Sequence, residues 1–136
     1  MQWINHAQPL ATMNLISALS FHRATTQIPD YLSVAIPRGT RGPVVLCAPV
    51  LYRPTKPVLL QDGYEQHQGE YGSFRVTTLE RTIADCCKHR NKIGMDVFLE
   101  ALRMAQSRLN LAELCRQAEA LRILNVITPH LQTLFA

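Results

Sequence analysis

The sequence predicts an α+β fold, and three regional patterns lead to that prediction. Residues 1–22 contain no Lys, Arg, Asp or Glu and include an apolar stretch with helical spacing. Residues 31–76 divide into short extended segments separated by prolines and glycines, whereas the remainder has the periodicity of amphipathic helices. We therefore expect one buried N-terminal helix, a mostly antiparallel small sheet of about five strands, and a C-terminal cluster of about four helical segments.

The N-terminal helix is expected over residues 10–21, where apolar side chains surround most of the helix circumference. A helix that is apolar nearly all round is buried, and Pro9 is compatible with its first turn. His22 follows this helix and is interpreted as a C-terminal capping residue rather than a catalytic base, because no nucleophile or metal partner is close in sequence. Residues 1–9 are interpreted as a remnant of an interdomain linker, and residues 1–136 as a single domain.

The sheet is expected from β-rich segments bounded by prolines. A polar QGEYG segment at 68–72 predicts a hairpin loop with arms at 65–67 and 73–76. Short strands with close turns favour antiparallel pairing. The expected strands are residues 32–36, 44–47, 50–53, 58–61 and 74–76.

The first helix of the C-terminal half is expected to begin at about Leu79, because Thr77 and Glu80 have the spacing of a capping box. Asp85 lies four residues after Arg81, which predicts a structural ion pair along the helix. The expected buried face consists of Leu79, Ile83, Cys86 and Cys87, and the helix is expected to end at Asn91 or Gly94.

Three further helices are expected after Gly94. Asp96 and Asn110 are suitable N-caps for the first two. The last is expected over residues 123–135, with an interruption at Thr128 and Pro129, where proline can begin a new turn.

Several short motifs occur one after another along nearly the whole chain. They are SALSFH at 17–22, TTQIP at 25–29, PRG at 37–39, RTIADC at 81–86 and RNKIGMD at 90–96. This series resembles the C-terminal domain of the AbiEi-type antitoxins of bacterial abortive-infection systems, the type IV toxin–antitoxin family. The resemblance assigns no role to the motif positions Ser17, His22, Thr25, Thr26 and Asp85. Members of that family usually carry an N-terminal winged helix-turn-helix domain, which these 136 residues do not contain.

The basic residues are the candidate contacts for a partner. The net charge is +4 and the pI is about 9.1, which is compatible with nucleic acid or another acidic partner. The glycine-flanked turn at 37–43 carries arginines that can reach phosphates, although a soluble hairpin tip has the same composition. The candidate nucleic-acid or acidic-partner contacts are Arg38, Arg41, Arg75, Arg81, Lys88, Arg90 and Lys92.

No enzyme motif is found, and we expect a non-enzymatic protein without cofactor or metal. The chain lacks the metal-binding carboxylate and Glu-x-Lys pattern of restriction-type nucleases, the paired aspartates of nucleotidyltransferases and glycine-rich phosphate loops. The four cysteines have no zinc-site spacing, and no apolar run is long enough to cross a membrane. A cytoplasmic location with reduced cysteine thiols is therefore expected.

Two functions remain as hypotheses. The resemblance implies an antitoxin and transcriptional-regulator-type domain for phage defence, which counteracts a nucleotidyltransferase-like toxin without a demonstrated direct complex. The basic surface would add weak, electrostatic nucleic-acid binding. The alternative is a truncated protein-interaction or dimerisation module, for example a homodimer, that uses the surface left by a missing domain. Growth rescue from the toxin favours the first hypothesis, and partner capture or dimerisation favours the second.

Overall fold

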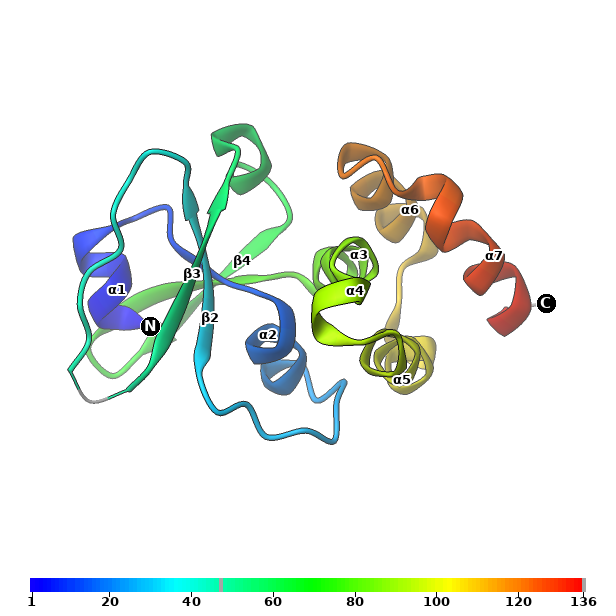
Figure 1. The fold of residues 1–136 in the computed structure, drawn as a ribbon, viewed down its shortest axis with the longest axis horizontal. Coiled ribbons are helices and arrows are strands. Elements are labelled where there is room, and N and C mark those ends of the chain that lie inside the picture. Colours follow the sequence, from blue (N-terminus) through cyan, green and yellow to red (C-terminus); the bar gives the residue numbers. More distant parts are fainter. Residues whose placement is uncertain (47, 136) are drawn as a thin grey trace.

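The protein has an α+β fold, as predicted. The computed structural model describes residues 1–46 and 48–135, and within them the chain forms seven α-helices and a five-stranded sheet. The sheet and α1 (Gln2–Ala7) lie at one end of the molecule and α5 (Met95–Ala105), α6 (Leu111–Ala120) and α7 (Leu124–Leu134) at the other (Figure 1). Helices α2 (Leu15–Phe21) and α3 (Leu79–Lys88) lie between them.

The sheet is mixed, which corrects the expectation of mostly antiparallel pairing. Its order is β3 (Val50–Thr55), β2 (Leu32–Pro37), β1 (Thr12–Met13), β5 (Gly72–Thr77) and β4 (Tyr64–Gly69). Strands β1 and β2 are antiparallel, as are β4 and β5, but β1 pairs in parallel with β5 and β2 with β3. Parallel neighbours need a connection that returns along the sheet, and the proline-containing segment 38–49 makes that return from β2 to β3.

Two predicted strands are not strands. Residues 44–46 have no regular secondary structure, and Cys47, the last residue of that prediction, lies outside the described residues. Residues 57–60 form a short 3₁₀-helix, η1 (Pro57–Leu60), whose first turn contains the proline. The predicted hairpin is confirmed: β4 and β5 pair throughout, from Tyr64 with Thr77 to Gly69 with Gly72.

The N-terminal region differs most from the prediction. The expected long helix is divided, because Thr12 and Met13 pair with β2 on one side and β5 on the other, and the helix begins only at Leu15. Residues 1–9, interpreted as a linker remnant, are packed against the rest of the fold. They contain α1, whose Ile4 packs against Ala11, Val34 and Ile36.

Asn5 of α1 bonds to two backbone groups beside the short strand β1, one on β5 and one on the residue that precedes β1. Its Oδ1 accepts a hydrogen bond from the Arg75 backbone N–H at 3.1 Å, and its Nδ2 donates to the Ala11 carbonyl oxygen at 2.6 Å. The Asn5 side chain thereby attaches α1 beside β5. The periodicity of apolar residues in the sequence does not indicate this role for Asn5.

Helix α3 begins at Leu79, as predicted, but its N-cap is Thr78 rather than Thr77. The Thr78 side chain accepts the Arg81 backbone N–H, while the Thr77 hydroxyl bonds to Thr82. Helix α3 ends at Lys88, and a separate short helix, α4 (Arg90–Ile93), follows and is terminated by Gly94. Gly94 has a positive φ of 104°, a conformation that favours glycine.

The later helices agree with the sequence except in detail. Asn110 caps α6 as predicted, with its side chain accepting the Glu113 backbone N–H at 3.1 Å. Helix α5 is capped at Gly94 rather than Asp96. Helix α7 continues through Pro129 without the predicted interruption, and the Thr128 hydroxyl donates to the Leu124 carbonyl oxygen in the preceding turn.

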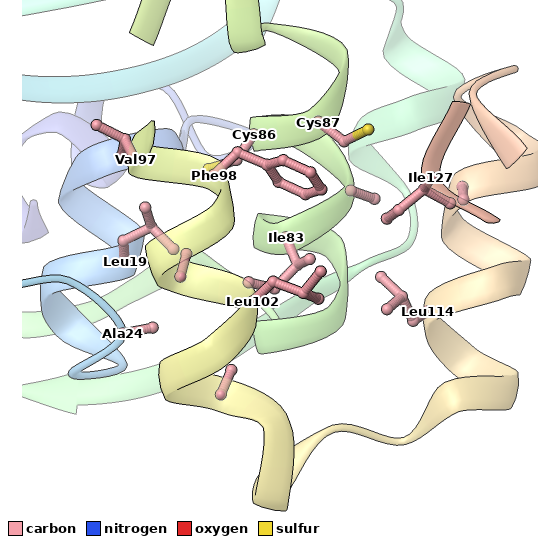
Figure 2. Close-up of a cluster of buried hydrophobic side chains, with 14 of the residues drawn as sticks. Leu19, Ala24, Ile83, Cys86, Cys87, Val97, Phe98, Leu102, Leu114 and Ile127 are labelled. Atoms are coloured by element: carbon pink, nitrogen blue, oxygen red, sulfur yellow. The ribbon is translucent and has the colours of Figure 1, made fainter. Parts of the chain in front are cut away.

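The largest hydrophobic core surrounds α3. Ile83, Cys86 and Cys87 of this helix pack against Leu19 of α2 and Phe98 of α5, with Leu114 and Ile127 on the far side (Figure 2). Burial raises the pKa of both thiols, so at neutral pH they are protonated and serve as small apolar side chains. Helix α3 contacts all the helices of this region, so the core holds it in a fixed position. The side chains of α3 that do not enter the core are thereby also held in place.

Candidate functional site

A cavity of about 540 Å³ lies against one face of the sheet. Its lining comes from all five strands, from η1, from one side of α3, from α4 and from the end of α6. Gly63, which follows η1, approaches α3 and α6 closely: a Cβ there would lie 2.8 Å from the Gln117 Oε1 atom, and its φ is +71°. The wall of the cavity therefore requires glycine at this turn.

The register of the sheet places four residues in one row across the floor of the cavity. Arg53 pairs with Ala35, Ala35 with Thr12, and Thr12 with Arg75. Directly paired residues project to the same face of a sheet, and all four line the cavity. Two small side chains thus lie between two arginines. The opposite face carries Met13, Val34 and Val76, which pack in the smaller cores.

The cavity lining is strongly cationic. It contains two carboxylates, and both have partners: Asp85 accepts from Arg81 Nε at 3.1 Å and Asp62 from Arg116 at 2.5 Å. Within residues 1–46 and 48–135, Arg81 alone among the lining cations has a carboxylate within 4.0 Å. The eight lining cations are Arg38, Arg53, Lys56, Arg75, Arg81, Lys88, Lys92 and Arg122.

Arg75 is the most unusual of these cations because it is buried without a counter-ion. Its residue exposure is 5%, its guanidinium carbon lies 3.5 Å from the centre of the Tyr64 ring, and one Nη donates to the Leu60 carbonyl oxygen. Its Nε has no hydrogen-bond partner in the described part of the chain, and burial lowers its pKa. A buried charge left without a compensating charge is costly, so this guanidinium favours an anion in the cavity.

The pKa of His89 is affected by the charges of the same cavity. Burial lowers its pKa, and the positive charges of Arg53, Lys88 and Lys92 lower it further, against an opposing effect of Asp85. The imidazole is therefore neutral at physiological pH and adds hydrogen-bonding capacity rather than charge. A bound anion would oppose these positive charges and raise this pKa.

The structure brings together five of the seven basic residues predicted from the sequence. Arg38, Arg75, Arg81, Lys88 and Lys92 line the cavity, although Arg75 and Arg81 are buried in its floor and wall rather than exposed on a surface. The other two lie outside the lining: Arg41 is exposed on the turn after β2, and Arg90 donates to the Cys87 carbonyl oxygen at 2.9 Å.

Sequence reasoning missed Arg53, Lys56, His89 and Arg122. Arg53 had a usable signal, because it alternates with Tyr52 and Pro54 in an otherwise apolar strand. The others lie in loops or at helix ends, where no periodicity shows which way a side chain points.

Four of the five motif positions make contacts that hold elements together. Ser17 of α2 accepts the Ser33 backbone N–H at 2.9 Å. His22 is the C-cap of α2, as predicted, and its Nε2 also donates to the Thr77 carbonyl oxygen at 2.7 Å. Thr25 and Thr26 both bond to the Glu100 carboxylate of α5. These four residues fasten α2 and its following loop to the sheet and to α5, whereas Asp85 lines the cavity.

Comparison with protein-family models gives no match to this chain, and comparison with curated proteins gives none either. Within the described residues, no three His, Cys, Asp or Glu side chains are grouped so as to hold a metal ion. None of the helices in that part of the chain has the length and apolar character needed to cross a bilayer. The case for a function therefore rests on the geometry of the basic cavity and on the sequence motifs.

Proposed function

We propose that this chain is a non-enzymatic, nucleic-acid-binding domain of the antitoxin type. The observation that carries the proposal is the set of lining cations around one cavity, of which only Arg81 has a carboxylate partner in the described residues. Such an arrangement attracts phosphates, and it leaves the folded protein with electrostatic repulsion that a polyanion would relieve. The motif series, with its resemblance to AbiEi-type antitoxins, supports the biological role.

The cavity favours a single strand or a strand end over a duplex. Its volume of about 540 Å³ accommodates about one or two nucleotides, whereas a duplex is far wider. Lys88 and Lys92 are exposed at the rim and Arg38 extends from the end of β2, so a strand leaving the cavity would continue along these side chains. Arginine and lysine contacts of this kind bind phosphates without reading sequence.

Reversing the charge at the rim should weaken oligonucleotide binding. For a Lys88→Glu/Lys92→Glu variant we expect at least about tenfold weaker binding of a short single-stranded oligonucleotide, and a slope of log affinity against log salt that is smaller by about 1–2. Fluorescence anisotropy of a labelled oligonucleotide between about 50 and 200 mM salt measures both quantities.

The matched control is Arg41→Glu/Arg103→Glu, which makes the same change of net charge at two exposed positions outside the cavity. Its affinity should stay much closer to that of the unmodified protein. Equal losses in the two double variants would assign binding to net charge alone, and an unmodified protein that binds no oligonucleotide would contradict the proposal.

The antitoxin role has its own test. Co-expression of the chain with a nucleotidyltransferase-like toxin of the kind that AbiEi-type antitoxins counteract should restore growth of a bacterial host, measured as colony count against an empty-vector control. Loss of rescue in the Lys88→Glu/Lys92→Glu variant would connect rescue with the cavity. Absence of rescue by a folded, expressed protein would favour the alternative, a protein-interaction module.

A further inference from the structure

We propose that the floor of the cavity binds a phosphomonoester between Arg53 and Arg75, namely the terminal phosphate of a nucleic-acid strand or of a free nucleotide. This inference specifies the ligand of the proposed nucleic-acid-binding cavity and rests on that proposal. Four observations support it: the sheet register, the unpartnered guanidinium nitrogens, the match of charge, and the enclosure of the site.

The register sets the two arginines on opposite sides of a small gap. Arg53 and Arg75 belong to the same cross-strand row, separated by Ala35 and Thr12, so their Cα atoms are about three strand spacings, or roughly 14 Å, apart. Arginine side chains are long, and the two residues between them are small. The gap therefore has room for a compact group. The Arg75 guanidinium lies over the Tyr64 ring of β4, so contact with that group from both sides requires the Arg75 side chain to turn toward Arg53.

Both arginines retain unused hydrogen-bonding capacity. The Nε atoms of Arg53 and Arg75 are the only buried side-chain nitrogen or oxygen atoms without a partner in the described residues. Buried polar atoms are nearly always hydrogen-bonded, so two exceptions on one floor indicate a missing acceptor. Phosphate oxygens are strong acceptors and match the fork of donors that arginine presents.

The charge favours a monoester over an internal diester. Neither arginine has a carboxylate partner in the described chain, so the floor carries two uncompensated positive charges. A terminal phosphate carries about −1.5 to −2 at neutral pH, whereas a diester carries a single negative charge. A diester would also have to bring its backbone in and out again past Arg75, which is 5% exposed, whereas a strand end enters only once.

The decisive experiment compares oligonucleotides that differ only in their ends. Anisotropy should show that a 5′-phosphorylated or 3′-phosphorylated strand binds about tenfold more tightly than the same strand with hydroxyl ends, as expected for an added charge-assisted contact. Competition with AMP and with inorganic phosphate tests the free-ligand source. Arg53→Gln should abolish the preference for phosphorylated ends, while Arg41→Gln, at an exposed position outside the cavity, should retain it.

Arg75→Met gives a second readout that separates binding from structural support. The substitution removes a buried cation without a counter-ion but also its bond to the Leu60 carbonyl oxygen and its contact with the Tyr64 ring, so the decisive readout is the effect of the ligand: AMP should raise the unfolding temperature of the unmodified protein and not that of the variant. An Arg75→Met variant that AMP stabilises as much as it stabilises the unmodified protein would contradict the inference.

The outcomes distinguish this inference from the broader proposal. If strands bind but their phosphorylated ends confer no advantage and AMP does not compete, the phosphomonoester site is wrong and nucleic-acid binding stands. If AMP binds through Arg53 and strands of neither kind bind, the phosphomonoester site stands and nucleic-acid binding is wrong.

Discussion

An Arg81→Met variant should lose about 3–5 kcal/mol of unfolding free energy at neutral pH, the loss typical when one partner of a buried ion pair is removed. Arg81 and Asp85 form such a pair, with side-chain exposures of 5% and 9% and a distance of 3.1 Å from Nε to Oδ1. Arg81 Nη1 also donates to the Leu59 carbonyl oxygen at 2.9 Å. The substitution therefore leaves a buried carboxylate uncompensated and a carbonyl without its donor.

The loss should depend on pH in a direction that identifies Asp85 as its cause. Burial raises the pKa of Asp85 above its ordinary value, although Arg81 opposes this. Without Arg81 the pKa rises further, so the folded variant binds a proton more tightly than the unfolded chain. Its stability should therefore be highest at acidic pH and fall as the pH rises from about 3.9, the ordinary pKa of Asp, through the raised value in the fold.

Urea denaturation at several pH values measures this effect. An Arg81→Met/Asp85→Leu double variant removes both charges, so it should recover most of the stability and lose the additional pH dependence. Arg41→Met, at an exposed position, should change the unfolding free energy by no more than about 0.5 kcal/mol. A single Arg81→Met variant as stable as the unmodified protein would mean that the pair does not support α3.

Phe98→Ala should destabilise the protein by about 3–5 kcal/mol, the usual cost of removing a large buried aromatic ring. Phe98 of α5 is fully buried in the core around α3 (Figure 2). Its ring meets the His130 ring of α7 edge to face, at 5.4 Å between centroids. The substitution removes packing between three helices at once, and the rigid surroundings cannot close the space completely.

Chemical denaturation also measures this change, with Met104→Ala as the control on the same helix. Met104 is 40% exposed, so its substitution should alter the unfolding free energy by no more than about 0.5 kcal/mol. Because Phe98 lies outside the cavity lining, Phe98→Ala should keep its oligonucleotide affinity at temperatures where it is folded. A loss of stability below about 1 kcal/mol would contradict the central position of Phe98 in the core.

Elements with local signals were predicted well. Asn110 caps α6, Leu79 begins α3, and the β4–β5 hairpin forms around a polar loop, because each depends on residues within a few positions of one another. Strand β1 was missed because it has two residues and depends on partners far along the chain. An apolar stretch that is buried on both sides has no periodicity that separates a short strand from a helix.

The candidate site shows the same division. The basic character of Arg38, Lys88 and Lys92 was visible in the sequence, and all three line the cavity. Their relation to Arg53 was not visible, because Arg53 lies on an edge strand whose parallel pairing with β2 requires the chain to return over a long segment. Burial of Arg75 and Arg81 was also unpredictable, since a charged side chain is normally exposed unless its surroundings compensate it.

The sequence by itself determined the α+β class, the order of most elements and the excess of positive charge, because composition, periodicity and capping act over short distances along the chain. Only the tertiary structure decided that Arg53 and Arg75 occupy one row of the sheet with two small residues between them. That row depends on three strand pairings between distant segments, and the face on which each arginine projects is set by their register.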